Sequence, residues 1–317
     1  MKAKNNEPLV TAIFLSYNHE KFLDKSIPSL LNQTYQNLEV IISDDNSSDN
    51  SFEVIKSLVN SGDTRVILNR NEINLGIAAH LNKIMEQVRG ELCVVFAGDD
   101  VSTNDRIEKL VSFWQSNGKP DSVFSSVWTI DSEDNICGEK AIDERKFLCK
   151  RNKLISELIY RSTSIIGCSH AWTTSSYRKF GDLSADVINE DRTIAFRSAL
   201  GSGIGYLAEK LVYYRIDSGI SNIKNDNNYS ILFNYNKVNS QRELIDLEQN
   251  KSDASKFNDR KLTNLIESRV KEVELLYHLS RNSLTFIELI RIIFSNARLS
   301  RIIKALLIYG KYKFKNL

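Results

Sequence analysis

Two adjacent carboxylates, Asp99 and Asp100, stand almost directly after a short apolar run of this sequence, residues 92–97 (LCVVFA). A run this short and this apolar predicts a strand that is buried on both faces of a sheet. Neighbouring carboxylates repel each other unless a cation or a ligand rich in hydrogen-bond donors holds them. Hard divalent cations bind carboxylate oxygens and share their remaining positions with phosphate and water. The pair therefore predicts a site for a divalent cation and a phosphate group.

A second acidic pair, Asp44 and Asp45, follows the mostly apolar run 38–42 (LEVII). If both runs are strands of one open α/β sheet, their carboxyl ends meet at the edge where such sheets bind ligands. The two pairs together predict a binding site at that edge. For Asp44 and Asp45 alone, a hydrogen-bonded turn at the start of a loop is the alternative.

The two acidic pairs can form one site only if the strands that precede them end at the same edge of a sheet. Strand patterns alternate with helical patterns, with strands expected at 10–15, 39–42, 65–68 and 92–97 and helices at 22–31, 52–59 and 77–88. Such β-α-β repeats predict an α/β fold with a mostly parallel central sheet and helices on both faces. The turn at residues 16–19 (SYNH) lacks the spaced glycines that admit a dinucleotide. A nicotinamide enzyme is therefore excluded.

The composition is ordinary for a soluble globular protein. The 317 residues are 42% hydrophobic and 26% charged, which suffices for one large domain with an appendage. A formal net charge of +2 argues against a nucleic-acid partner, because such proteins carry a basic excess. The four cysteines lack zinc-like spacing, the first residues lack the apolar centre of a signal peptide, and no apolar run suffices to span a membrane. We expect a cytoplasmic protein, either free or peripheral on the inner face of the plasma membrane.

An ordered set of segments resembles the family 2 glycosyltransferases. The segments are residues 10–18 (VTAIFLSYN), 31–35 (LNQTY), 38–47 (LEVIISDDNS), 74–76 (NLG), 90–100 (GELCVVFAGDD), 189–192 (NEDR) with 196–197 (FR), and 211–221 (LVYYRIDSGIS). Each segment alone is weak evidence for the family, but the set is strong evidence because the segments occur in the family's order over about residues 8–222. The resemblance implies the GT-A fold, a nucleotide-sugar donor, a divalent metal (Mn²⁺ or Mg²⁺) and transfer with inversion at the anomeric carbon.

The resemblance also implies, by position, which residues bind the donor. Those expected to line the nucleotide pocket are Leu15, Ser16, Tyr17 and Asn18. Asp45 would contact the nucleoside base, Asp99 would face the ribose, and Asp100 would ligate the metal that bridges the diphosphate. The metal serves the chemistry, because departure of a nucleoside diphosphate builds negative charge that a bound cation offsets.

The sequence departs from the family at two positions near the diphosphate. Many relatives have an arginine where this chain has Ala79 and His80, so His80 is either near the diphosphate or an ordinary packing histidine. Many relatives have a histidine where this chain has Asp217, which could supply an oxygen ligand to the metal or have no role. Arg215 is the better candidate for a diphosphate contact, since guanidinium matches phosphate geometry. Its alternative is an ion pair at the domain edge.

The acceptor half of the site is expected farther along the chain. Asp191 matches the general base of the family, which takes the proton of the acceptor hydroxyl on the face opposite the leaving group. Glu190 is the adjacent competitor, and both residues also suit the first turn of a helix, whose N-terminus favours negative charge. His170 and Trp172 are candidates for acceptor contacts, because an indole face packs on a sugar ring. The alternative for both is an ordinary place in the core.

The character of the sequence changes after about residue 222, so we expect a GT-A catalytic domain at 8–222 and a helical C-terminal region at 223–317. Apolar residues recur at helical spacing between 262 and 277. Residues 284–317 mix apolar and basic side chains, as in helices that lie on an anionic membrane surface. A helix packed back on the protein is the alternative.

The predicted function is that of an inverting, metal-dependent hexosyltransferase of the bacterial surface-polysaccharide type. The resemblance favours a UDP-sugar as donor and a hydroxyl of a glycan or a lipid-linked sugar as acceptor. One alternative is an inactive relative that binds carbohydrate or acts as a scaffold. Another is a nucleotidyltransferase, which usually carries a glycine-rich and basic loop after the first strand that is absent here.

Overall fold

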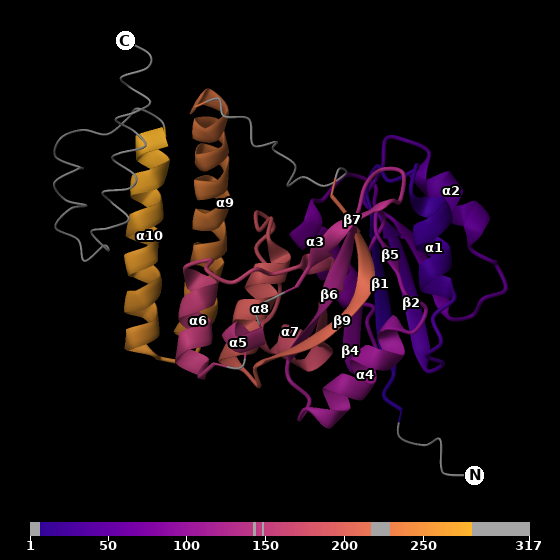
Figure 1. Ribbon diagram of the computed structural model, residues 1–317, viewed down its shortest axis with the longest axis horizontal. Helices are drawn as coiled ribbons and strands as arrows, with labels where there is room; N and C mark the ends of the chain where they lie inside the picture. Colours follow the sequence, from indigo (N-terminus) through magenta and orange to yellow (C-terminus); the bar gives the residue numbers. More distant parts are fainter. Residues whose placement is uncertain (1–6, 142–143, 148, 217–228, 281–317) are drawn as a thin grey trace. The chain divides into compact units, whose positions relative to one another are not determined.

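The computed structural model describes residues 7–141, 144–147, 149–216 and 229–280. By the density of its contacts the chain divides into two compact units (Figure 1). The first comprises Met1–Asp186 and Glu190–Asn222, and the second comprises Val187–Asn189 and Ile223–Leu317.

The described strands of the first unit form one nine-stranded sheet, in the order β3-β2-β1-β4-β8-β6-β9-β5, with β7 paired to β6. The strands are β1 (Val10–Ser16), β2 (Leu38–Asp44), β3 (Val66–Arg70), β4 (Leu92–Ala97), β5 (Val101–Ser102), β6 (Ser122–Ile130), β7 (Ile136–Lys140), β8 (Ala171–Thr173) and β9 (Ile204–Arg215). The predicted α/β fold is confirmed. The sheet is mixed, because the short strand β8 runs antiparallel between β4 and β6.

Eight helices and one short 3₁₀ turn connect the described strands of this unit. They are α1 (Leu23–Leu31), α2 (Ser51–Leu58), α3 (Ile77–Met85), α4 (Arg106–Ser116), α5 (Glu144–Phe147), α6 (Arg151–Ile159), η1 (Gly167–Ser169), α7 (Thr174–Phe180) and α8 (Glu190–Leu200). Strands β1, β2 and β4 are almost wholly buried, as apolar runs packed under helices on both faces should be.

The register of the parallel strands brings the predicted acidic pairs to one edge. Strand β1 lies between β2 and β4, with Ser16 opposite Asp44 and Leu15 opposite Ala97. All three strands therefore end at the same level, and the chain leaves each of them toward the same edge of the sheet. The acidic pairs stand at or just after these ends.

The second unit contains the helices α9 (Tyr229–Ser255) and α10 (Arg260–Ser280), which pack against each other. Arg269 of α10 forms an ion pair with Glu243 of α9 at 2.7 Å, and a second one with Glu272 of its own helix at 3.0 Å. Among the helices that the structure describes, none is long and apolar enough to cross a membrane. The basic stretch 284–317 lies outside the described residues.

Candidate functional site

The loop after β1 forms one wall of the site. Asn18 has a positive φ of 58°, a conformation that asparagine tolerates better than most residues. Its side-chain oxygen accepts a hydrogen bond from the Ser48 backbone N–H at 2.8 Å, which ties this loop to the loop after β2. Leu15 is half-buried, and Ser16 has a buried hydroxyl with no hydrogen-bond partner among the described residues. Tyr17 exposes 44% of its surface, which leaves its ring free to contact a ligand.

The two members of the first acidic pair have different tasks. Asp44 is fully buried and accepts hydrogen bonds from the backbone N–H and the hydroxyl of Ser47. It therefore forms the local turn that was the alternative for this pair. Asp45 points elsewhere, and its carboxylate accepts from the Asn71 side chain at 2.7 Å and from the N–H groups of Leu75 and Gly76, each at 3.0 Å. Asp45 is thus a fixed acceptor beside the segment where α3 begins.

The second acidic pair lies in the tight turn between β4 and β5. Asp100 is buried, and it accepts a hydrogen bond from the Arg215 backbone N–H at 2.8 Å. Asp99 is half-buried beside it. Burial, and then the charge of Asp99, raise the pKa of Asp100 well above its ordinary value, against smaller opposing contributions. A divalent cation at this position would relieve the cost of keeping both carboxylates ionised.

The acidic turn could bind a divalent cation if the diphosphate of a bound nucleotide supplied some of the oxygen ligands. In the part of the chain that the structure describes, no three His, Cys, Asp or Glu side chains come together as a closed metal site. Two carboxylates, completed by diphosphate oxygens and water, are the set that Mg²⁺ prefers with phosphate substrates. Asp217, the other residue named as a possible ligand, lies outside the described residues.

His19, which the sequence did not single out, packs beside the acidic turn. A Cβ atom added at Gly98 would lie 2.3 Å from His19 Nδ1, so this position has no room for a side chain. The N–H of Gly98 also donates to the Leu15 carbonyl at 2.9 Å. Glycine at position 98 thus allows the acidic turn to approach the loop after β1.

Arg215 does not reach into the site, and its expected diphosphate contact is not what the structure supports. Its side chain is 1% exposed, and its guanidinium donates to the carbonyl oxygens of Asp99 and Asp131 and to the carboxylate of Asp134. The group also lies over the Phe22 ring, 4.4 Å from its centre. Arg215 therefore forms a buried ion pair with Asp134, which was the alternative to a diphosphate contact. It also holds the Asp99-Asp100 turn through two hydrogen bonds, one to the Asp100 carboxylate and one to the Asp99 carbonyl.

The turn η1 brings the acidic pair and the predicted base together. The thiol of Cys168 and the carboxyl group of Asp100 are close enough that each shifts the pKa of the other. A Cβ atom added at the preceding residue, Gly167, would lie 2.9 Å from the Asp191 Oδ2 atom. Asp100 and Asp191 are 91 positions apart in the sequence, yet they contact consecutive residues of one short turn.

Asp191 is held at the start of α8 with its carboxylate toward η1. Its Oδ1 atom accepts a hydrogen bond from the Arg192 N–H at 2.7 Å, which orients the group. The side chain is half-buried, and the loss of surrounding water raises its pKa, although the neighbouring Arg192 and Arg161 oppose that shift. Glu190, also half-buried, stands one residue earlier in the first turn of the same helix. A carboxylate with a raised pKa is suited to take a proton near neutral pH.

His170 and Trp172 belong to the core, so the expectation that they contact an acceptor is not supported. They are 1% and 2% exposed. The imidazole of His170 lies 2.8 Å from the Ser122 hydroxyl and stacks on Phe124, with ring centres 4.0 Å apart. Burial lowers the pKa of His170 to about 3, so the ring stays neutral. Both positions fit the alternative, an ordinary place in the core.

His80 is also a packing residue. It is buried on α3, and its Nε2 atom lies 2.7 Å from the Ser43 hydroxyl. Burial lowers its pKa, against the opposing charges of Asp45 and Asp44.

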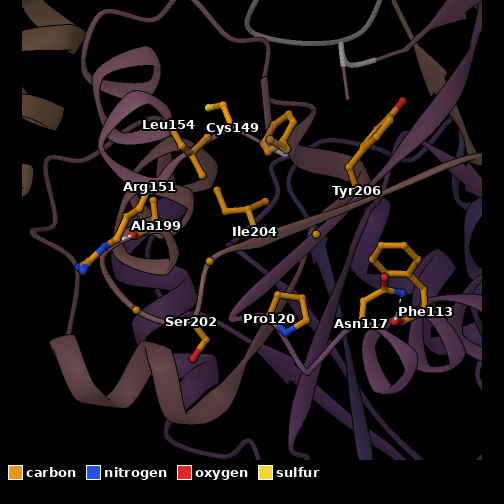
Figure 2. Close-up of a pocket in the computed structure, with 14 residues that line it drawn as sticks. Phe113, Asn117, Pro120, Cys149, Arg151, Leu154, Ala199, Ser202, Ile204 and Tyr206 are labelled. Atoms are coloured by element: carbon orange, nitrogen blue, oxygen red, sulfur yellow. Dashed lines mark hydrogen bonds between the residues drawn. The ribbon is translucent and has the colours of Figure 1, made fainter. Parts of the chain in front are cut away.

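The first unit also contains a pocket of about 390 Å³, and Figure 2 shows the residues that line it. Pro120, Ile204 and Tyr206 line it, where β6 and β9 begin. These two strands run parallel, and β9 ends at Arg215, which contacts Asp100. The pocket is therefore at the opposite end of the strands from the acidic turn and is not part of this site.

Comparisons with known proteins give the family and the fold of the chain. The model of a family described as Glycosyl transferase family 2 matches residues 11–179, more than half of the chain. An uncharacterized glycosyltransferase of Methanocaldococcus jannaschii is 34% identical over 148 residues, which are 46% of this chain and 51% of that protein. An Escherichia coli protein named UDP-Glc:alpha-D-GlcNAc-diphosphoundecaprenol beta-1,3-glucosyltransferase is 34% identical over 110 residues, 34% of this chain and 42% of that one. The chain thus spans about half, or less, of the length of these relatives.

Two solved structures share the fold at low sequence identity. Staphylococcus aureus TarS 1-349 in complex with UDP has a TM-score of 0.55 at 14% identity, covering 86% of this chain and 87% of that chain. A mannosyltransferase from Pyrobaculum calidifontis, in complex with GDP-Man and Mn²⁺, has a TM-score of 0.57 at 16% identity, covering 97% and 81%. At such identities the likeness shows the fold alone.

Proposed function

The chain belongs to glycosyl transferase family 2 and has the GT-A fold, and we propose that it transfers a sugar from a nucleoside-diphosphate donor to an acceptor hydroxyl, with inversion at the anomeric carbon. The observation that carries the proposal is the turn η1, where Cys168 contacts Asp100 and Gly167 packs against Asp191. An inverting displacement needs a stabilised leaving group on one face of the sugar and a base on the other. One short turn between the two carboxylates keeps both within reach of one sugar ring.

The donor would bind along the edge formed by β1, β2 and β4. Asp45 is an acceptor and so favours a base with an N–H on its pairing edge, which uracil and guanine both have. TarS was solved with UDP and the mannosyltransferase with GDP-Man, and the name of the E. coli relative includes UDP-Glc. We assign a UDP-sugar as donor, with Leu15, Ser16, Tyr17 and Asn18 lining its pocket.

Asp99 would face the ribose, and Asp100 would hold a divalent metal, Mn²⁺ or Mg²⁺. The bound ion would offset the charge that develops on the departing diphosphate. The chain's own contribution is the rigid turn between β4 and β5, which Arg215 anchors through Asp100 and through the Asp99 carbonyl. We assign Arg215 a positioning role in place of a direct phosphate contact.

Asp191 would take the proton of the acceptor hydroxyl. Its carboxylate lies against Gly167 of η1, which supports Asp191 over the neighbouring Glu190. Two relatives have names that include undecaprenol-linked diphosphate acceptors. We therefore propose a glycan or a lipid-linked sugar as acceptor, in the synthesis of a surface polysaccharide. Residues 8–222 would form the catalytic domain, and residues 223–317 would form a helical region that meets the inner face of the membrane.

Hydrolysis of nucleotide sugars tests this function without knowledge of the acceptor. We expect Mn²⁺-dependent release of a nucleoside diphosphate from one member of a panel that includes UDP-Glc, UDP-GlcNAc and GDP-Man. Coupled detection of UDP or GDP measures the release, and EDTA should abolish it. If no donor is hydrolysed and calorimetry detects no binding, the protein is the inactive binding or scaffolding relative instead.

Replacing Gly167 with alanine should slow the reaction without loss of fold. The added Cβ would lie 2.9 Å from Asp191 Oδ2 and 3.3 Å from its Cβ, so the carboxylate must move. A small displacement of a catalytic group can cost about 10²-fold in rate, and we expect kcat to fall by about ten- to a hundredfold. Gly138→Ala is the matched control, because its Cβ would meet nothing closer than the Thr129 hydroxyl at 3.4 Å. Equal kcat values for the two variants would show that Asp191 need not lie against η1.

A further inference from the structure

Arg106 is a buried cation at the start of α4. Its side chain is 1% exposed and shares the buried face of the helix with Ile107, Leu110, Val111 and Trp114. Burying a charged group is costly unless other groups compensate it. Among the described residues no carboxylate forms an ion pair with Arg106, and its Nε atom has no hydrogen-bond partner. Such a residue calls for an explanation other than a structural salt bridge.

The contacts of Arg106 surround the acidic turn. Its Nη1 atom donates to the Ser102 hydroxyl at 2.9 Å, on the strand that follows Asp100. Its Nη2 atom donates to the Cys168 carbonyl at 2.7 Å, on η1. The guanidinium also lies over the ring of Phe96, near the end of β4, 4.6 Å from the ring centre. The group thus bridges the segment that carries Asp100 and the turn against which Asp191 packs.

We propose that Arg106 is a positioning residue that fixes η1 between Asp100 and Asp191, so that the base and the metal-binding carboxylate keep their relative placement. This inference rests on the proposed function. The planar guanidinium offers two parallel donors, which hold Ser102 and Cys168 in a fixed mutual orientation. Without it the Cys168 carbonyl would be unpaired, and the neighbouring Gly167 would no longer be held behind the Asp191 carboxylate.

The charge of Arg106 provides a means to separate this role from general stability. Burial lowers the pKa of Arg106 to about 10, so the group is still charged at neutral pH. Asp100 is among the groups that feel its charge. Loss of that positive charge makes the acidic turn more attractive to a divalent cation. Arg106→Met should therefore impair catalysis without weakening Mn²⁺ binding, whereas a collapsed site would lose both.

The experiment compares Arg106→Met, Arg106→Lys and the control Arg197→Met. Arg197 is also 1% exposed, and its guanidinium donates to the Gly181 carbonyl at 2.7 Å and to the Asp182 carbonyl at 3.2 Å. For each variant we would measure kcat for donor hydrolysis at saturating Mn²⁺, the Kd of Mn²⁺ in the presence of UDP by electron paramagnetic resonance, and Tm.

We expect Arg106→Met to lower kcat by at least about tenfold while the Mn²⁺ Kd stays the same or decreases. Arg106→Lys should recover part of kcat, and Arg197→Met should lower Tm with kcat close to that of the wild type. The inference is overturned if Arg106→Met keeps its kcat, if its Mn²⁺ binding weakens in step with kcat, or if Arg197→Met loses as much activity. If Arg106→Met does not fold, an Arg106→Lys variant with wild-type kcat overturns it equally. A wild-type protein that hydrolyses no donor contradicts the proposed function itself, and the inference fails with it.

Discussion

Asp191→Asn should lower kcat for hydrolysis of the nucleotide-sugar donor by about 10³-fold, the size of effect that general base catalysis supplies. The amide has nearly the shape of the carboxylate, so it can still accept the Arg192 N–H hydrogen bond and pack against Gly167. It cannot take a proton. Binding of UDP with Mn²⁺ should be unchanged in calorimetry, because the proposed base would contact the acceptor hydroxyl and not the nucleotide. The loss should therefore appear in kcat and not in donor affinity.

The pH dependence of the rate is a second test of Asp191 as the general base. Because burial raises the pKa of Asp191, the base is protonated at pH values where an exposed aspartate is already ionised. The rate should therefore rise with pH through a pKa above the ordinary aspartate range, and Asp191→Asn should remove that rise. Glu190→Gln is the matched control, with an expected kcat close to wild type. If Glu190→Gln shows the large loss and Asp191→Asn does not, Glu190 is the base.

The sheet and its acidic edge could be predicted because local sequence controls them. Residues 38–42 and 92–97 are short, mostly apolar runs with several β-branched residues, which favours interior strands. Parallel pairing then requires their carboxyl ends to meet, as the register of β1 with β2 and β4 shows. The position of Asp45 and Asp100 follows from these two facts alone.

The side-chain partners could not be predicted, because they come from distant segments. Arg215 is neutralised by Asp134, which the turn between β6 and β7 brings close. His170 and Trp172 are buried because β8 inserts between β4 and β6. A strand of three residues is too short for its sequence to predict this pairing. A carboxylate, an arginine or an indole has the same sequence signature whether it meets a ligand or a neighbour.

The burial of Arg106 has a signal in the sequence. Arg106 stands at helical spacing from Leu110 and Trp114, and the structure buries all three on one face of α4. A charged residue on such a face must be compensated inside the protein. In contrast, the close approach of His19 to Gly98 depends on the path of two loops, and no spacing rule predicts it.

Asp100→Asn should abolish Mn²⁺-dependent hydrolysis, with a loss of about 10³-fold or more, because an uncharged amide is a poor ligand for a hard cation. The asparagine oxygen can still accept the Arg215 N–H hydrogen bond, so the turn between β4 and β5 should keep its shape. Electron paramagnetic resonance of Mn²⁺ with UDP should show the corresponding loss of affinity. Asp134→Asn is a useful control, since it removes a carboxylate from the same arginine network but not from the proposed metal site. If Asp100→Asn binds Mn²⁺ with wild-type affinity, Asp100 is not a metal ligand.

Thermal unfolding should separate loss of the metal from loss of the fold. A carboxylate whose pKa is raised by burial binds its proton more tightly in the folded state, so its ionisation above that pKa costs stability. In EDTA at neutral pH, Asp100→Asn should therefore unfold at the same temperature as the wild type or at a higher one. Mn²⁺ with UDP should raise the Tm of the wild type, because a ligand that binds only the folded state stabilises it, and should leave the variant unchanged. A variant that is less stable than the wild type in EDTA would mean that Asp100 holds the turn together, and its loss of activity would then say nothing about a metal.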